Sequence, residues 1–345
     1  MGRKRKAPRK KDVLRQQRLW RLYFKTLAIA LAVIAGLVIL AYGVFNYLIS
    51  GMVRTDVNEG ELSINTELAE KEAKITNVAL FGLDSRNHNY KGLSDATLVL
   101  SVNDKTGEIK LTSLARDTYV AVPGYGNTKL THAYSYGGAE LAMQTLNENF
   151  KLDISDYVTV NFDSLADVID TFGGIELEIT EGERREINAY LLSGDSLQES
   201  GLVHLNGPQA VSYSRIRNIG GDDMRTERQR TVLSCLFEKG LEINPISYPG
   251  YIKKFAPMVE TSLSNEEMLS LAKVGALGKG RVVLEQAAFP NEYIPHHGET
   301  IAKVWYYVYD LDVAADMLHQ YVYDGITFEE YGKPADDTTL DVPEQ

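Results

Sequence analysis

The densest run of functional side chains in this sequence is SRIRNIGGDDMRTERQR, residues 214–230, which holds five arginines and no lysine. Arginine presents a planar fork of N–H donors that matches the oxygens of a phosphate or carboxylate. Arg215 and Arg217 are two residues apart, so on extended chain both side chains would point to the same side. Arg225 and Gln229 have the i, i+4 spacing that places them on one helix face, near its positive end. This run therefore predicts an oxyanion site.

Arg228 and Arg230 fall on other faces of the same expected helix. We predict that they lie on its solvated face or pair with Glu227 and Asp223. The alternative for the whole run is a charged, solvated helix start that binds no ligand.

Two aspartates flank a glycine-containing loop earlier in the chain, in GLDSRNHNYKGLSDATL. Asp84 ends one expected strand and Asp95 begins the next. Two carboxylates at neighbouring strand ends suit Mg²⁺, which binds one or two carboxylates together with phosphate oxygens and water. The alternative is that each aspartate only caps its turn.

The dipeptide Arg116–Asp117 follows a third expected strand. At the carboxyl end of a strand, Arg116 would lie where α/β folds bind their ligands. A surface ion pair of little energetic consequence is an equally good interpretation of the same two residues.

Apolar and alternating segments indicate the elements that would hold these side chains. Strands are expected at 75–83, 96–103, 108–115, 156–162 and 175–180, and helices at 137–150 and 163–172. A short helix before Arg215 and a longer one at 222–240 would carry the arginines. Further helices are expected at 265–278 and 311–323, with strands at 281–289 and 303–309. This interleaving predicts an α/β fold, a layered α-β-α domain with a mixed central sheet.

The N-terminus predicts a membrane anchor. The first 25 residues hold eleven Lys or Arg, and residues 27–49 form a run of 23 without a charge. Such a run is long enough to cross a bilayer and longer than the apolar part of a signal peptide, so we expect one retained transmembrane helix. A cleaved leader is the alternative. Positive charge stays in the cytoplasm, so residues 1–26 would form an inner tail and everything after the helix would lie outside.

The charge of the outer part argues against nucleic acid as a partner. Beyond the first 25 residues the chain holds 25 basic and 46 acidic residues, a net charge of −21 that would repel a polyanion. We expect a juxtamembrane stalk at 50–75 and a folded domain at 76–240. A C-terminal α/β part at 241–333 would complete that domain or pack on it, and 334–345 would form a disordered tail.

Six motifs follow one another between Asn77 and Gly240: GLDSR…SDATLVLSVN, LTSLARDTYVAVPGYG, KLTHAYSYGGAELA, VNFDSLADVIDTFGGIELE, LNGPQAVSYSRIR and RTERQR. With the N-inside anchor, they resemble the LytR-CpsA-Psr family of bacterial cell-wall proteins. The resemblance implies that 76–240 is a catalytic domain outside a single-pass anchor in a bacterial cell membrane. It also implies an enzyme that moves a glycopolymer, such as teichoic acid or capsule, from an undecaprenyl-pyrophosphate carrier to peptidoglycan, with Mg²⁺ or alternatively Mn²⁺.

Carried over by position, the resemblance implies roles for individual residues. The metal ligands would be Asp84 and Asp95. The pyrophosphate contacts would be Arg116, Arg215, Arg217, Arg225 and Gln229. The family usually has an arginine where this chain has Leu93, so that contact would be absent here or would come from Arg86 or Lys91. The proton of the attacking hydroxyl would go to Asp84, Asp95 or Asp117.

Two other functions use the same residues. A hydrolase would admit water in place of the acceptor and act as a pyrophosphatase on the lipid carrier. A non-catalytic or regulatory module would hold wall polymers without needing paired aspartates. For the transferase, the lipid tail would need an apolar groove, which 157–162 and 165–179 would line unless they form the core.

Overall fold

The computed structural model describes residues 40–69, 75–83, 92–191, 196–244, 247–277 and 284–331. The chain divides into two compact units, residues 1–51 and 52–345. In the first unit, residues 40–49 are helical, and most of the expected anchor lies outside the described residues. Within the described ranges, no helix has both the length and the apolar character needed to cross a membrane. The expected tail 334–345 also lies outside them.

A seven-stranded sheet forms the centre of the second unit. Its order is β1 (Val53–Arg54), β10 (Glu260–Thr261), β7 (Asp156–Asn161), β2 (Ile75–Leu83), β3 (Ser94–Asn103), β4 (Ile109–Leu114) and β11 (Leu284–Phe289). β2, β3 and β4 form an antiparallel meander, while β7 pairs with β2 and β11 with β4 in parallel. The prediction of an α/β fold with a mixed central sheet is confirmed.

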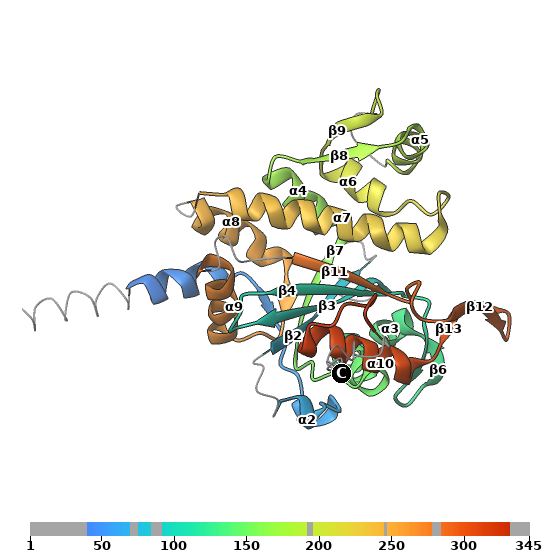
Figure 1. Ribbon diagram of the computed structural model, residues 1–345. Coiled ribbons are helices and arrows are strands. Elements are labelled where there is room, and N and C mark those ends of the chain that lie inside the picture. Colours follow the sequence, from blue (N-terminus) through green and yellow to red (C-terminus); the bar gives the residue numbers. More distant parts are fainter. Residues whose placement is uncertain are drawn as a thin grey trace, which may run out of the picture. The chain divides into compact units, whose positions relative to one another are not determined.

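Helices cover both faces of this sheet (Figure 1). α3 (Leu130–Phe150) and α10 (Leu311–His319) lie on one face, and α4 (Phe162–Thr171) and α7 (Gly221–Glu242) lie on the other. Side chains of β2 alternate between them: Phe81 packs into the main core with Met143 of α3, whereas Leu80 lies with Val232 of α7. α10 continues into a π-helical turn, η4 (Gln320–Asp324).

A second apolar cluster lies beside α7 and away from the sheet. β8 (Ile175–Ile179) pairs with β9 (Gly201–Leu205), and α5 (Glu181–Tyr190) and α6 (Gly207–Ser214) pack with them. The strand expected at 175–180 is therefore present, but it belongs to this separate hairpin.

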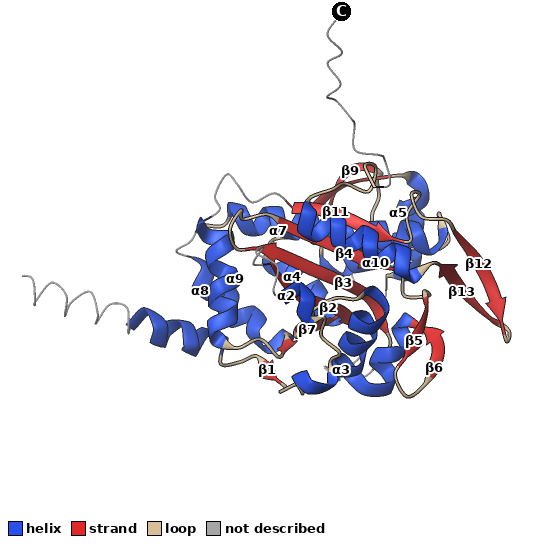
Figure 2. Ribbon diagram, turned by 60° about the horizontal axis from the view of Figure 1, so that its bottom comes forward, coloured by secondary structure: helices blue, strands red, loops and turns tan. Residues whose placement is uncertain are grey.

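The remaining elements lie at the two ends of the sheet, as Figure 2 shows. At one end are two hairpins, β5 (Tyr119–Val122) with β6 (Gly126–Lys129) and β12 (His296–Ile301) with β13 (Val304–Tyr309). At the other end are α8 (Tyr248–Phe255) and α9 (Asn265–Leu277). Short helical turns complete the described chain: η1 (Glu59–Glu61), α2 (Thr66–Ala69) and η3 (Ala256–Met258).

The described residues 52–69, from the expected stalk, belong to the second unit. β1 lies in the central sheet, where Val53 pairs with Glu260. Leu62 is fully buried in the main core. The described part of the expected stalk is therefore not an independent stalk.

Candidate active site

Strand register brings Asp95 and Arg116 together. β3 and β4 are antiparallel and pair Thr97 with Leu114. Two residues further along the same register, Asp95 falls opposite Arg116. Arg116 Nη1 donates to Asp95 Oδ1 at 2.6 Å, and the two side chains are 17% and 12% exposed. This is a largely buried ion pair at the end of the sheet.

Two more arginines reach Asp95 from the chain around the start of α7. Nη2 of Arg217, a side chain that is 45% exposed, lies 3.7 Å from Asp95 Oδ2. Arg225 is buried on α7, and its Nη2 donates to the main-chain oxygen of Asp95 at 2.6 Å. Arg215 ends α6 in helical conformation, so the extended chain expected there is wrong. Three of the predicted arginines thus surround one aspartate.

Asp117 lies on the other side of Arg116. It is buried, with Oδ1 2.7 Å from Lys129 Nζ and Oδ2 3.5 Å from Arg116 Nε. The sequence interpretation missed Lys129, for which the available signal is its place in KLTHAYSYGG directly before α3. Lys129 extends the row of charges along the end of the sheet.

Gln229 connects the arginines to an apolar cavity. It follows Arg225 by one helical turn, is buried, and lines a cavity of about 160 Å³ between α7, α4 and the sheet. The lining residues are Leu80, Phe81, Gly82, Ala96, Leu98, Val158, Val160, Asn161, Leu165, Ser214, Gln229, Val232 and Leu233. Of the segments expected to form a groove, 157–162 contributes three residues and 165–179 contributes only Leu165. Residues 175–179 belong to the separate hairpin.

Arg228 does not lie on a solvated face, so that prediction is wrong. Its side chain is 2% exposed, and Nε donates to Glu183 Oε1 at 2.9 Å. Nη1 lies 3.3 Å from the main-chain oxygen of Ile216 and 3.1 Å from that of Ile219. Because these two carbonyls flank Arg217, Arg228 holds the loop that presents that residue. Arg230 is half-buried, and burial lowers the pKa of its guanidinium.

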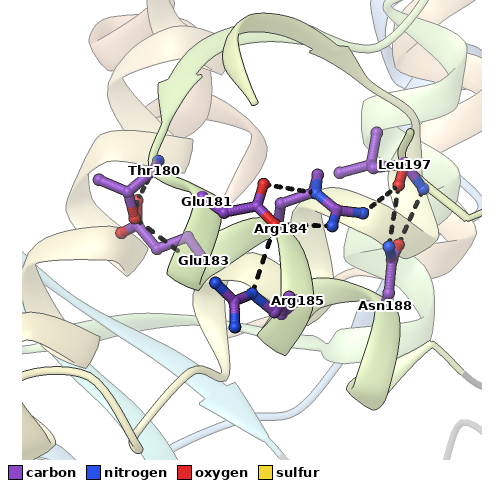
Figure 3. Close-up of polar contacts among 7 residues, drawn as sticks. All are labelled: Thr180, Glu181, Glu183, Arg184, Arg185, Asn188 and Leu197. Carbon is purple, nitrogen blue, oxygen red and sulfur yellow. Dashed lines mark hydrogen bonds and ion pairs between the residues drawn. The ribbon is translucent and has the colours of Figure 1, made fainter. Parts of the chain in front are cut away.

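Glu183 is fixed from two sides. Figure 3 shows it at the start of α5, where it forms a reciprocal cap with Thr180. Burial acts to raise the pKa of the Glu183 carboxyl, but hydrogen bonds from the Thr180 main chain and from Arg228 outweigh it, and the pKa is lowered. The charged form of Glu183 is therefore favoured, which suits a partner for a buried arginine.

Similarity to known proteins identifies the family of this chain. The sequence model of the LytR_cpsA_psr family matches residues 49–321. The chain belongs to this family. It is 30% identical to the polyisoprenyl-teichoic acid–peptidoglycan teichoic acid transferase TagU of Oceanobacillus iheyensis, over 82% of this chain and 87% of that relative.

Solved structures of the LytR-CpsA-Psr family have the same fold. The Bacillus subtilis TagT structure aligns with a TM-score of 0.61 at 24% identity, over 77% of this chain and 98% of TagT. A TagT structure with bound octaprenyl pyrophosphate lipid aligns with a TM-score of 0.58 at 23% identity, over the same shares of each chain.

Of the two aspartates predicted to bind a metal, the structure describes only Asp95. Asp84, Arg86 and Lys91 lie outside the described residues, although Leu83, directly before them, pairs with Ser94 next to Asp95. Among the described residues, no group of three or more His, Cys, Asp or Glu is placed to hold a metal. Asp95 has the right donor chemistry for Mg²⁺, but its oxygens also face two arginines, so a metal site would depend on Asp84.

Proposed function

We propose that this LytR-CpsA-Psr protein transfers a glycopolymer from a polyprenyl-pyrophosphate carrier to peptidoglycan and so forms a phosphodiester link. The observation that carries the proposal is the convergence of Arg116, Arg217 and Arg225 on Asp95, beside an apolar cavity. An arginine-rich site next to an apolar cavity matches a ligand that joins a pyrophosphate to a hydrocarbon tail. The name of the Oceanobacillus relative, a polyisoprenyl-teichoic acid–peptidoglycan teichoic acid transferase, supports a transfer of this kind.

The pyrophosphate would be bound by Arg116, Arg215, Arg217, Arg225 and Gln229, with Arg86 as a further contact. The first isoprene units would enter the cavity beyond Gln229. Tail and charge would then be recognised by adjacent parts of one site, the tail on the face of the sheet covered by α7 and the charge at the end of the sheet.

In the transfer, an acceptor hydroxyl, the C6 hydroxyl of N-acetylmuramic acid, attacks the sugar-proximal phosphorus. The bond to the polyprenyl phosphate breaks, and the arginines stabilise the charge that develops on the phosphate oxygens. The hydroxyl proton goes to Asp84, Asp95 or Asp117. Of these, Asp95 and Asp117 contact cations that would hold them in place.

Mg²⁺ held by Asp84 and Asp95 is part of the proposal. When bound, it would neutralise phosphate charge. Purified full-length protein, a polyprenyl-pyrophosphate sugar and a peptidoglycan oligomer would test this together with the transfer itself. We expect product with Mg²⁺, little product in excess EDTA and none from Asp95→Asn. Full activity in EDTA would refute the metal, and cleavage of the carrier that is independent of acceptor would identify a hydrolase.

The membrane topology is also proposed, from the charge pattern of residues 1–49. Residues 1–26 would lie in the cytoplasm, 27–49 would span the bacterial cell membrane, and the rest would lie outside. Protease added to intact protoplasts should remove the part after residue 50. Survival of that part would contradict the surface location.

A further inference from the structure

An exposed pair of stacked tyrosines lies at the end of the sheet that carries the arginines. Tyr125 occupies the β5–β6 turn and Tyr136 lies on the first part of α3. The centroids of the two rings are 4.6 Å apart, and the ring planes are inclined by only 21°. The two residues are 57% and 43% exposed. Stacking fixes the two rings relative to each other while leaving much of their surface in solvent.

Polar groups adjoin the tyrosine pair. The His132 ring lies 5.7 Å from that of Tyr136, and its Nδ1 is 2.7 Å from the Thr128 hydroxyl. Burial and the nearby charge of Lys129 lower the pKa of His132. At neutral pH its imidazole is therefore uncharged and suited to hydrogen bonding with neutral hydroxyl and amide groups. Flat aromatic faces beside such groups are the chemistry that binds a sugar ring.

This surface is continuous with the charged site. Lys129, directly before α3, contacts Asp117, which in turn contacts Arg116. The charges of all three residues influence the pKa of His132, which is therefore close to them. One strip along β6 and the first turns of α3 therefore runs from the proposed phosphate site to the tyrosines.

The strip and the apolar cavity lie on opposite sides of the sheet. The cavity is under α7, whereas α3 packs against the other face (Figure 1). In phosphoryl transfer the attacking and leaving oxygens are roughly in line on either side of phosphorus. If the polyprenyl phosphate leaves on the α7 side, the attacking hydroxyl must approach from the side where the tyrosines lie.

We infer that Tyr125, Tyr136 and His132 form the binding platform for the acceptor, the glycan strand of peptidoglycan. The inference rests on the proposed function, because it assigns the second substrate of the same site. Sugar rings of the strand lie on the tyrosine faces, and the imidazole and Thr128 hydroxyl bind their hydroxyl or acetamido groups. The strand thus brings its reacting hydroxyl to the charged end of the strip.

The test measures transfer rates with full-length protein while the acceptor and the donor are varied separately. Tyr125→Ala and Tyr136→Ala should each raise the KM for a peptidoglycan oligosaccharide by about tenfold, the size expected for one lost stacking face. The KM for the polyprenyl-pyrophosphate donor should not change. Tyr125→Phe and Tyr136→Phe keep the ring and should retain most of the acceptor affinity.

Tyr190→Ala is the matched control, because Tyr190 is 37% exposed but lies on α5, on the far side of α7. Unchanged acceptor KM in both alanine variants would overturn the inference, and a raised donor KM would show that the platform holds donor sugar instead. If the wild-type protein transfers nothing, the proposed function fails. Sedimentation with insoluble peptidoglycan then decides the platform separately: binding must be lost in the alanine variants and kept in Tyr190→Ala.

Discussion

Arg225 and Arg228 are three residues apart on α7 and equally buried, at 2% exposure, yet their surroundings differ in charge. Arg228 meets one carboxylate, that of Glu183, and two main-chain oxygens. Arg225 belongs to a chain of contacts in which the described residues place four cations, Arg116, Lys129, Arg217 and Arg225, with two carboxylates, Asp95 and Asp117. Arg225 lies in a site with excess positive charge and is suited to bind an anion, whereas the charge of Arg228 is balanced and its role is structural. Burial and spacing do not distinguish the two residues.

The largest expected effect is a loss of stability when the balanced ion pair of Arg228 and Glu183 is broken. Arg228→Ala leaves Glu183 buried without its charge partner, which typically lowers the free energy of unfolding by about 3–5 kcal/mol. Denaturant titration measures this loss. The double variant Arg228→Met with Glu183→Leu should recover part of it, because no lone charge remains. A loss below about 1 kcal/mol for Arg228→Ala, typical of exposed positions, would remove the distinction.

Arg217→Lys tests the side with excess charge. Lysine keeps the charge but not the forked donors, so we expect transfer to fall on the order of 10²-fold, as when one preorganised donor is removed. Stability should change by less than about 0.5 kcal/mol, because the side chain is 45% exposed. Arg185→Lys is the control, at 72% exposure on α5 (Figure 3). Equal transfer rates in the two variants would indicate a diffuse basic surface.

The smallest effect is the pH dependence of the balanced pair. The pKa of Glu183 is lower in the folded protein than its ordinary value. Such a group stabilises the fold above its unfolded pKa, and the contribution is lost as pH falls through the folded value. Unfolding free energy should therefore decline as the pH drops below about 4.3. Glu183→Gln, which can keep the helix cap, should flatten this part of the profile. An unchanged acid profile would mean that other carboxyls dominate.

Sequence patterns predicted the central strands within a few residues, because β2, β3 and β7 alternate or run apolar where they are buried. β12 was missed because five of its six residues are exposed, so hairpin pairing rather than burial creates it. α5 was missed because EGERREINAY buries only Glu183 and Ile187.

Spacing predicted that Arg217 and Arg225 would share a site, whereas only the family resemblance added Arg116 to it. The contact of Arg228 with Glu183 was not predictable from the sequence. It depends on where α5 places Glu183, which is 45 residues away in the chain and in no pattern with it. Spacing along α7 therefore gave the helix face of each arginine but not what that face would meet.

The parallel pairing of β11 with β4 has a consequence for how the chain becomes a folded protein. Every candidate phosphate-binding residue precedes residue 231, but all six residues of β4 are buried, and they pair in register with Leu284–Phe289. A chain cut after residue 240 would keep the arginines but expose the edge of a strand that is buried in the full chain, and an exposed strand edge is a template for aggregation. During synthesis, β4 likewise cannot pair with β11 until about 170 further residues have been made. In the proposed topology, the domain therefore completes its folding only after nearly the whole chain has been exported. Deletions near the C-terminus should lower the yield of folded protein rather than the transfer activity of the molecules that fold.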